Sequence, residues 1–327
     1  MSGAPGWGFV GTGSICRTVA ADLRLLGTDR LVAASSRDQA RAQAFCDDLG
    51  AEAATGYGSV TDLVADPRVD IVYVGTPHAQ HAAAVRIALL AGKAVLCEKA
   101  MTVSVADTAE LIALARERGV FLMEAVWMRF NPLIARLGSL IADGAIGRLH
   151  HVAATFGFPA PYDPQARLWD PGQGGGALLD MGVYPVNFAQ LLLGTPDTVQ
   201  VVGSRSPEGI DAAAGLALSF PEGAMAQLSC SLLAPLAGTA QVAGSTGRID
   251  LAATFLSPTA MTLHRDGAQP EQFRIEPEGA GYVPELREVE SRVAAGQTES
   301  TVMPLQDSLT VAEIISQALD TLGVRYP

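Results

Sequence analysis

The sequence contains few charged and few aromatic residues, and its basic residues form no run or stripe. Charged residues make up 17% of the 327 positions and aromatic residues 6%. The lack of clustered positive charge argues against binding to nucleic acid or to an anionic membrane surface. No uncharged apolar run reaches the roughly 20 residues of a membrane-spanning helix, since Arg86 and Lys93 interrupt residues 83–96. Residues 1–13 lack the basic start and cleavage pattern of a secretory signal.

Cysteine is also scarce. Cys16, Cys46, Cys97 and Cys230 form no C-x-x-C pair, so we expect reduced thiols in a cytoplasmic protein, with neither a disulfide framework nor a metal site. By contrast, 49% of the residues are hydrophobic and the formal net charge is −12. A chain of this length and composition is predicted to bury two cores rather than to remain disordered.

Residues 1–125 alternate short apolar runs with helical patterns. Strands are predicted at residues 7–10, 31–35, 71–74, 94–97 and 121–123, and helices at residues 14–26, 38–49, 79–91 and 105–118. This alternation is typical of a doubly wound α/β domain, in which helices cover both faces of a parallel sheet. We therefore expect the first domain to have a Rossmann fold.

From residue 126 onward the pattern changes. Helices are predicted at residues 131–143 and 178–193, short strands at 198–204, 216–220, 224–231, 248–251 and 261–264, and two final helices at 285–295 and 308–322. Turn residues such as Asp266-Gly267 separate the strands. The second domain, residues 126–327, is therefore predicted to be α+β, with a large, open, mostly antiparallel sheet and helices on one face.

A glycine-rich turn follows the first predicted strand. Gly11-Thr12-Gly13-Ser14-Ile15-Cys16 opens the first helix, and glycines there let the backbone approach a pyrophosphate at the helix N-terminus. The G-x-G-x-x-G pattern is incomplete, because Cys16 occupies its third glycine position. The turn predicts dinucleotide binding, and the alternative is a purely structural connection between strand and helix.

The residues after the second predicted strand bear on the choice of cofactor. Dinucleotide folds that use NAD carry an acidic residue there, which binds the ribose 2′-hydroxyl. This sequence has Ser36-Arg37 instead, with Arg41 one helical turn later. A hydroxyl and guanidinium groups can bind a 2′-phosphate, so NADP is favoured over NAD. The alternative is that both arginines are ordinary solvated residues at a helix start.

Other polar residues follow predicted strands at the edge where doubly wound folds bind ligands. Glu98 and Lys99 end the strand at residues 94–97, and the loop after residue 74 contains Thr76, Pro77, His78 and His81. We expect these residues near the cofactor. Lys99 is either a cation close to the substrate or a residue whose charge reaches solvent.

Asp180 and Tyr184 lie four residues apart, after three consecutive glycines at positions 174–176. In a helix they share one face. A nearby lysine would stabilise the phenolate of a tyrosine, lower its pKa from about 10 and let it exchange a proton with a substrate hydroxyl. The alternative is that Tyr184 is a core aromatic residue and Asp180 a cap or a solvated acid.

These segments together resemble the Gfo/Idh/MocA oxidoreductase family and, within it, the dimeric dihydrodiol dehydrogenases and NADP-dependent D-xylose 1-dehydrogenases. The matches extend over almost the whole chain: the glycine-rich turn, residues 94–99, 123–130, 174–184 and 322–327. One position departs from the pattern, since Ala100 stands where the family has proline. If the Lys99–Ala100 bond is cis, as the family's Lys-Pro bond tends to be, the non-proline form costs about 3 kcal/mol.

The resemblance implies roles for individual residues. Lys99 would polarise the reacting oxygen and tune Tyr184, Tyr184 would be the acid/base, and Asp180 would orient the substrate or Tyr184. His81 and Trp127 would line the nicotinamide and substrate pocket, and Arg167 and Trp169 would reach the cofactor from the second domain. Phe156 begins a loop region expected in the pocket wall. The open sheet face would form a homodimer interface, and the last helix would pack on the nucleotide domain.

The sequence therefore predicts an NADP-dependent oxidoreductase that moves a hydride between the nicotinamide and a carbon of a sugar or vicinal diol. The alternative is a non-catalytic sensor that binds NADP on the same fold. A sensor has no need of Tyr184, which favours the enzyme. The sequence is compatible with several sugars or diols as the substrate, and with a dimer or a tetramer.

Overall fold

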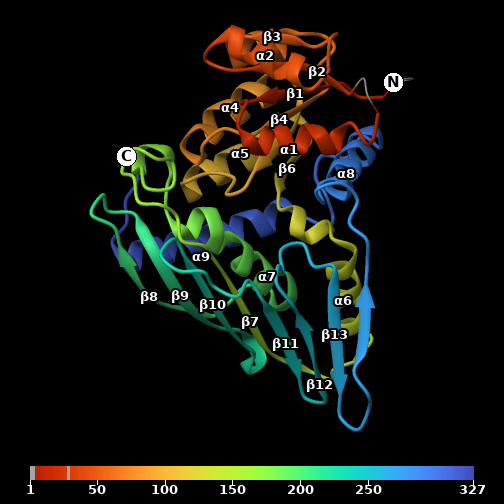
Figure 1. The fold of residues 1–327 in the computed structure, drawn as a ribbon, viewed down its shortest axis with the longest axis vertical. Coiled ribbons are helices and arrows are strands. Elements are labelled where there is room, and N and C mark those ends of the chain that lie inside the picture. Colours follow the sequence, from red (N-terminus) through yellow and green to blue (C-terminus); the bar gives the residue numbers. More distant parts are fainter. Residues whose placement is uncertain (1–3, 28–29) are drawn as a thin grey trace. The chain divides into compact units, whose positions relative to one another are not determined.

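The computed structural model describes residues 4–27 and 30–327. Residues 1–3, which belong to the segment that we interpreted as lacking a secretory signal, lie outside the described part. The chain forms two compact units (Figure 1). The first comprises Met1–Trp127 and Pro277–Ser308, and the second comprises Met128–Glu276 and Leu309–Pro327. Among the described residues, no helix is long and apolar enough to cross a membrane.

The first unit contains a six-stranded parallel sheet, which confirms the predicted Rossmann fold. Its strand order is β3-β2-β1-β4-β5-β6, where the strands are β1 (Trp7–Val10), β2 (Leu31–Ser35), β3 (Thr55–Tyr57), β4 (Ile71–Val74), β5 (Ala94–Glu98) and β6 (Leu122–Ala125). Every residue of β1, β4, β5 and β6 is buried, as expected of strands covered on both faces. Between β1 and β4 the strand order reverses, and ligands of such sheets bind at the carboxyl ends of the strands there.

Helices α1 (Ser14–Leu23), α2 (Gln39–Asp48), α3 (Val60–Ala65), α4 (His78–Leu90) and α5 (Val105–Arg118) connect these strands. Side-chain caps mark the start of two of them: Asp38 accepts N–H bonds at the start of α2, and Ser104 does so at the start of α5. Sequence analysis missed β3 and α3. The three residues of β3, Thr-Gly-Tyr, contain no apolar run, so hydrophobic periodicity gave no signal.

A segment from late in the chain also belongs to the first unit. Residues from Leu309 onward belong to the second unit, and residues 277–308, which include α8 (Val283–Ala294), belong to the first. Packing of the last helix on the nucleotide domain stays a prediction. Buried polar contacts explain the placement of residues 277–308. Asp22 of α1 accepts the N–H groups of Ala280 and Tyr282, and Trp7 Nε1 donates to Glu290 at 3.0 Å.

The second unit contains an eight-stranded sheet in the order β14-β13-β12-β11-β7-β10-β9-β8. The strands are β7 (Leu149–Gly157), β8 (Thr198–Arg205), β9 (Asp211–Ser219), β10 (Met225–Ser231), β11 (Ala240–Gly244), β12 (Gly247–Leu251), β13 (Ala260–Arg265) and β14 (Glu271–Arg274). All neighbouring pairs are antiparallel except β7 and β10. The predicted mostly antiparallel sheet is therefore confirmed, although β7, β11 and β14 were not anticipated.

Helices cover one face of this sheet. Helix α7 (Val183–Leu193) packs on β7 and β10, and Leu322, at the end of α9 (Leu305–Leu322), lies against Gly203 of β8. Helix α6 (Pro132–Ala142) also belongs to this unit, starting with a cap from Asn131. Residues on the opposite face, such as Val202 and Met225, remain 74% and 46% exposed.

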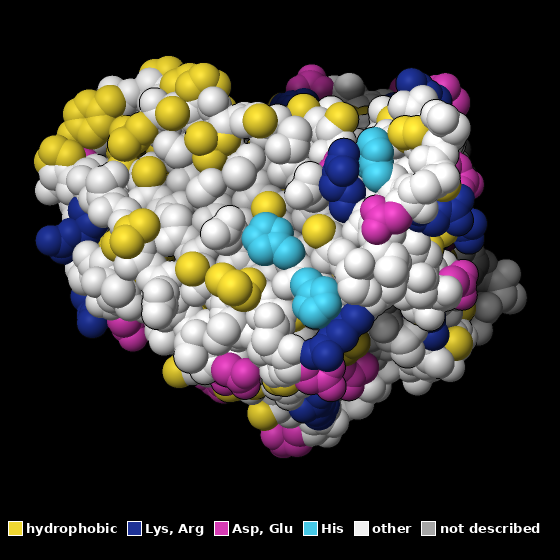
Figure 2. Space-filling view, turned by 90° about the horizontal axis from the view of Figure 1, so that it is seen from below, with side chains coloured by type: hydrophobic (Ala, Val, Ile, Leu, Met, Phe, Trp, Pro, Cys, Tyr) yellow, Lys and Arg dark blue, Asp and Glu magenta, His cyan; other side chains and the backbone are white. Residues whose placement is uncertain are grey.

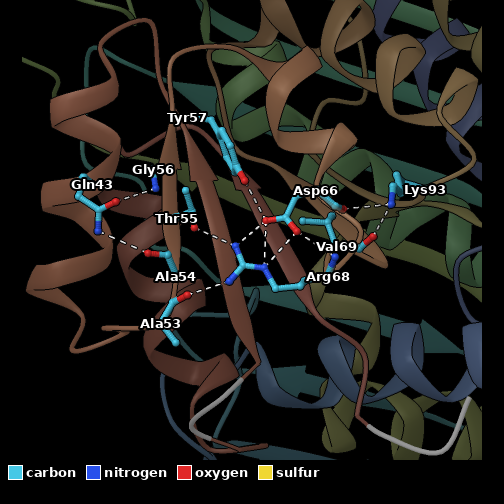
Figure 3. Close-up of polar contacts among 10 residues, drawn as sticks. All are labelled: Gln43, Ala53, Ala54, Thr55, Gly56, Tyr57, Asp66, Arg68, Val69 and Lys93. Atoms are coloured by element: carbon cyan, nitrogen blue, oxygen red, sulfur yellow. Dashed lines mark hydrogen bonds and ion pairs between the residues drawn. The ribbon is translucent and has the colours of Figure 1, made fainter.

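The buried carboxylate of Asp66 forms hydrogen bonds that link the segments around β3, at the edge of the first sheet (Figure 3). Asp66, after α3, accepts bonds from Tyr57 Oη at 3.0 Å and from Arg68 Nε at 3.1 Å. Arg68 also donates to Ala53 O at 2.9 Å and Thr55 Oγ1 at 2.8 Å. The hydrogen bonds from Arg68 lower the pKa of Asp66 from 3.8 to about 2.

We predict that Asp66→Asn lowers the free energy of unfolding at pH 7 by about 1 to 2 kcal/mol, because a buried charged acceptor is lost while the half-exposed Arg68 is partly resolvated. The folded pKa lies below the unfolded value, so this stability is present above about pH 4 and is lost as the pH falls toward 2. Urea unfolding of both proteins from pH 7 to pH 2.5 checks this.

The control is Asp48→Asn, which removes an exposed ion pair with Arg17 and should change the unfolding free energy by less than about 0.5 kcal/mol. Equal urea midpoints for wild type and Asp66→Asn at pH 7 would contradict the prediction.

Candidate functional site

The glycine-rich turn has the backbone geometry of an anion-binding turn. Gly13 precedes α1, and no side chain caps the helix start, so the first N–H groups of α1 are left for other acceptors. Gly11 has φ +111°, and a Cβ there would lie 2.8 Å from Gly75 O at the end of β4. A Cβ at Gly13 would meet nothing within 4 Å. Gly11 is thus required by packing, whereas Gly13 borders open space.

Two hydroxyl groups close to this turn fit a polar ligand. Ser35 ends β2 and Thr76 follows Gly75; the oxygens Ser35 Oγ and Thr76 Oγ1 are both buried without a hydrogen-bond partner among the described residues. Buried polar atoms are usually paired. Together with the uncapped helix start, these unpaired oxygens fit a dinucleotide, which carries hydroxyl and phosphate groups.

Arg41 is fixed toward the same turn. Its Nε donates to Thr12 Oγ1 at 3.0 Å, which joins α2 to the loop between β1 and α1. Arg37 is exposed and Ser36 is half-buried at the carboxyl end of β2. The structure therefore brings Arg41, but not Arg37, into hydrogen-bond contact with the turn.

Lys99 follows β5, and its backbone is held by side chains rather than by a neighbouring strand. The Lys99–Ala100 peptide bond is cis. His78 Nε2 lies 3.1 Å from Lys99 O, and His81 Nδ1 lies 3.0 Å from Ala100 O. His81 Nε2 lies 2.7 Å from Thr76 O. Burial lowers the pKa of His81, so the ring is neutral near pH 7 and donates to only one of its two carbonyl neighbours at a time.

Two buried carboxyl groups accept the N–H groups on either side of Ala100. Glu98 Oε2 accepts from Lys99 N at 3.3 Å, and Glu124 Oε1, from β6, accepts from Met101 N at 2.9 Å. Tyr73 Oη, from β4, donates to Glu98 Oε1 at 2.7 Å. The segment from Lys99 to Met101 is thus fixed by residues of three neighbouring strands and of α4.

The acids around Lys99 are crowded. Burial raises the pKa of Glu98, although Lys99 opposes this, and burial together with Glu98 and Glu124 raises the pKa of Glu285 well above its ordinary value. Both carboxyl oxygens of Glu285, on α8, lack a hydrogen-bond partner among the described residues. Protonation of Glu285 leaves fewer negative charges in this interior, in keeping with these shifts.

At the end of the first unit Trp127 stacks on Tyr282, with ring centroids 4.6 Å apart. Tyr282 is itself fixed by the bond from its N–H to Asp22. The pair gives Trp127, one of the predicted pocket residues, a defined ring orientation.

In the second unit, Asp180 and Tyr184 do not lie on one regular α-helix. Leu178–Gly182 forms a π-helical turn that continues into α7, so the predicted single helix at residues 178–193 was wrong in its first turn. A Cβ on Gly182 would lie 3.0 Å from Cys230 Sγ. The close approach of this turn to β10 depends on that glycine, and π turns of this kind are frequent at functional sites.

The two side chains have different neighbours. Asp180 Oδ1 accepts a bond from Arg167 Nη2 at 3.0 Å, while the ring of Tyr184 stands edge-on to Phe156 with centroids 5.9 Å apart. Arg167 is therefore paired with the predicted orienting acid. Phe156 and Tyr184, both predicted substrate neighbours, are brought together.

Two predicted cofactor neighbours are deeply buried. His81 is 0% and Trp169 2% exposed, and the indole N–H of Trp169 donates to Pro161 O at 2.9 Å. Both side chains therefore pack among protein groups, and their contact with the cofactor stays a prediction. Conversely, sequence analysis missed Glu124, whose signal was a carboxylate within the apolar strand Leu122–Ala125.

No group of three or more His, Cys, Asp or Glu side chains within residues 4–27 and 30–327 could hold a metal ion. The four cysteines are buried free thiols.

Comparison with known proteins gives a consistent result. Residues 6–126 match the oxidoreductase family with an NAD-binding Rossmann fold, and residues 134–250 match the GFO/IDH/MocA C-terminal domain. Among curated proteins, the chain is 37% identical to trans-1,2-dihydrobenzene-1,2-diol dehydrogenase of Macaca fascicularis, over 98% of both chains. It is 36% identical to the human enzyme of that name, again over 98% of both.

Two solved structures show the same arrangement of elements. A 3-ketoreductase from Actinomadura kijaniata, in complex with NADP and TDP-benzene, has a TM-score of 0.84 and 28% identity, covering 97% of this chain and 98% of that one. An aldose-aldose oxidoreductase from Caulobacter crescentus, complexed with glycerol, has a TM-score of 0.87 and 26% identity, covering 98% of both.

Proposed function

Because the chain belongs to the Gfo/Idh/MocA oxidoreductase family, we propose that it is an NADP-dependent oxidoreductase acting on a hydroxyl-bearing carbon of a sugar or a vicinal diol. The observation that carries the proposal is the set of side chains that fix the Lys99 backbone at the carboxyl end of β5. Such fixed geometry is what a residue that must meet a reacting oxygen requires.

The cofactor would be held by the turn after β1. The N–H groups at the start of α1 would bind its pyrophosphate, with Gly11, Thr12, Gly13, Ser14 and Ile15 forming the turn. Ser36, Arg37 and Arg41 would bind the 2′-phosphate. Four further residues would lie beside the cofactor at the carboxyl edge of the sheet: Thr76, Pro77, His78 and Glu98. When bound, the nicotinamide supplies hydride acceptance and donation.

The chain's own residues would handle the proton and the charge. In the oxidative direction the substrate hydroxyl proton would pass to the phenolate oxygen of Tyr184, and in reduction the resulting phenol would return it. The ammonium group of Lys99 would polarise the reacting oxygen, which carries negative charge once its proton has left in oxidation and develops negative charge as hydride arrives in reduction. Asp180, fixed by Arg167, orients the substrate or Tyr184.

The relatives and the aromatic residues of each unit support the proposed substrate class. The relatives act on a trans-dihydrodiol by name, and the solved structures are named as a 3-ketoreductase and an aldose-aldose oxidoreductase. Trp127 and Phe156 each present a half-buried ring, and apolar ring faces with few polar groups suit small diols and sugars.

We also propose that the protein forms a homodimer through the open face of the second sheet. Residues on this face are paired across neighbouring strands, as Val202 with Gly215 and Gly215 with Ser229. In Figure 2 histidine side chains lie among backbone atoms and uncharged polar side chains, which are drawn in white. The histidines other than the buried His78 and His81 are His150, His151 and His264, all on β7 or β13.

Ser229→Arg would place a charge on this face and is predicted to convert a dimer into a folded monomer, because a charge in a closed interface is costly. Asp266→Arg, in the exposed turn after β13, is the control and should remain dimeric. The molar mass in solution checks both. A monomeric wild type would refute the dimer.

The role of Lys99 is tested by Lys99→Met, which keeps the length of the side chain and removes its charge. We predict a loss of turnover by a factor of about 10³ or more, since a preorganised charge next to a developing oxyanion is worth roughly this much, while the Kd for NADPH changes little. The chain's only other lysine, Lys93, donates to Val69 O away from β5's carboxyl end, and Lys93→Met should retain turnover. Turnover by Lys99→Met near the wild-type rate would refute the assigned role.

The choice of cofactor is tested with Arg41→Ala. Loss of a charge-assisted bond to a 2′-phosphate should raise the KM for NADP by about tenfold or more, equivalent to roughly 1.4 kcal/mol. The KM for NAD should be unchanged. Arg17→Ala, which removes an exposed arginine of α1 paired with Asp48, is the matched control. Equal effects of Arg41→Ala on both cofactors would contradict binding of the 2′-phosphate by Arg41.

A further inference from the structure

The start of β9 lies against the turn that leads into the helix of Tyr184. Asp211, the first residue of β9, is 0% exposed, and its Oδ2 accepts the N–H of Leu178 at 2.6 Å. Leu178 is the first residue of the π-helical turn. Asp211 Oδ1 has no hydrogen-bond partner among the described residues. A fully buried carboxyl group with one unpaired oxygen is costly, so packing alone does not account for it.

The end of the chain contacts the same turn. Tyr326 Oη donates to Gly175 O at 2.6 Å, and Arg205 Nη1 donates to Gly323 O at 2.8 Å, which fixes the tail. Gly176 has φ +119°, and a Cβ there would collide with Asp211 Oδ1 and lie 3.1 Å from Tyr326 Oη. Asp211 and Tyr326 therefore enclose the Gly176 backbone between them.

We propose that Asp211 and Tyr326 are positioning residues that fix where the helix of Asp180 and Tyr184 begins, and that the charge on Asp211 makes this positioning depend on pH. The inference rests on the proposed function, because it concerns the placement of the proton-transfer tyrosine. Neither residue needs to touch the substrate. Each acts through the backbone of Gly175 to Leu178.

The charge state of Asp211 changes within the working range of most enzymes. Burial raises its pKa to about 7, although the N–H groups of Leu178 and Ala177 lower it. The ionised carboxylate is the stronger acceptor for these N–H groups, and it also lies at the positive end of the helix dipole. Ionisation therefore tightens the start of the helix, and protonation loosens it.

The ionisable groups that face Asp211 do not neutralise it. Tyr326, from the tail, and Cys230, from β10, both have pKa values raised by burial and by Asp211, so both are uncharged near pH 7. Arg205, opposite Asp211 in the register of β8 and β9, donates to Gly323 O instead. The negative charge of Asp211 is therefore stabilised by backbone N–H groups and, among the described residues, not by a cationic side chain.

Ionisation of Asp211 fixes the turn before Tyr184 but lowers the free energy of unfolding. The folded pKa of about 7 lies above the ordinary aspartate value of 3.8, so between these values the folded protein binds more protons than the unfolded one. Stability therefore falls as the pH rises from about 4 through 7. Removing the charge should therefore relieve a cost at alkaline pH. A residue with a merely structural role would show the opposite result, a loss of stability on substitution.

The test compares Asp211→Asn, Tyr326→Phe and the double variant with wild type in the same turnover assay. Asn keeps an acceptor for Leu178 N–H and removes the charge. We expect kcat of Asp211→Asn to fall by about tenfold or more, in the range that displacement of a reacting group produces, with an unchanged KM for NADP. The rise of wild-type kcat through about pH 7 should disappear. Asp197→Asn, an exposed acid before β8, is the control and should match wild type.

Urea unfolding at pH 5 and pH 8.5 separates positioning from structure. Asp211→Asn should be at least as stable as wild type at pH 8.5, and Tyr326→Phe should show the same reduction in kcat, with no further loss in the double variant. Hydrogen exchange at residues 175–182 should be faster in both single variants. A kcat within twofold of wild type, or a loss of kcat that parallels a loss of stability, would overturn the proposal.

Tyr184→Phe distinguishes failure of this inference from failure of the proposed function. If Tyr184→Phe is inactive while Asp211→Asn turns over at the wild-type rate, only the positioning role is refuted. If Tyr184→Phe itself retains turnover, the proposed proton transfer is refuted. In that case hydrogen exchange at residues 175–182 still decides whether Asp211 and Tyr326 fix the turn.

Discussion

The first unit depends on how β5 ends. At the carboxyl edge of a parallel sheet, the chain that leaves a central strand loses its ladder partners, and buried N–H and C=O groups must then be satisfied by other means. Here His78, His81, Glu98 and Glu124 supply these partners to the Lys99–Met101 backbone. Tyr73 in turn fixes Glu98. The position of Lys99 therefore follows from the packing of neighbouring strands. Substitutions in that interior should consequently move its ammonium group.

The same constraint appears in the second unit, where a glycine-rich turn rather than a strand end is fixed. Gly175 and Gly176 permit close approach, and the groups that come close are Asp211 and Tyr326. In both units, buried ionisable groups contact backbone next to a residue with a proposed role in the reaction. Such groups are expensive to bury, and perturbed acids of this kind gather at functional sites in many enzymes.

The fold class and most elements could be predicted because strands buried on both faces, such as β1 and β4, are continuous apolar runs. The elements that were not predicted, β3, β7, β11, β14 and α3, are short or contain small and polar residues on an exposed face. The Gly11 turn and Lys99 were identified from their place after strands. Asp211 and Glu285 were not, because a carboxyl group becomes informative only when its burial is known. The π turn at Leu178–Gly182 was not predicted either, since its residues are equally compatible with an α-helix.

The proposed oxidoreductase activity is tested most directly by initial rates at alkaline pH, measured with NADP and separately with NAD. The substrates are aldopentoses, aldohexoses, inositols and trans-diols, and the product followed is the reduced nicotinamide. We predict turnover with NADP on at least one of these classes, and slower or no turnover with NAD. Tight binding of NADPH without turnover of any class would contradict the account and favour a cofactor-binding sensor.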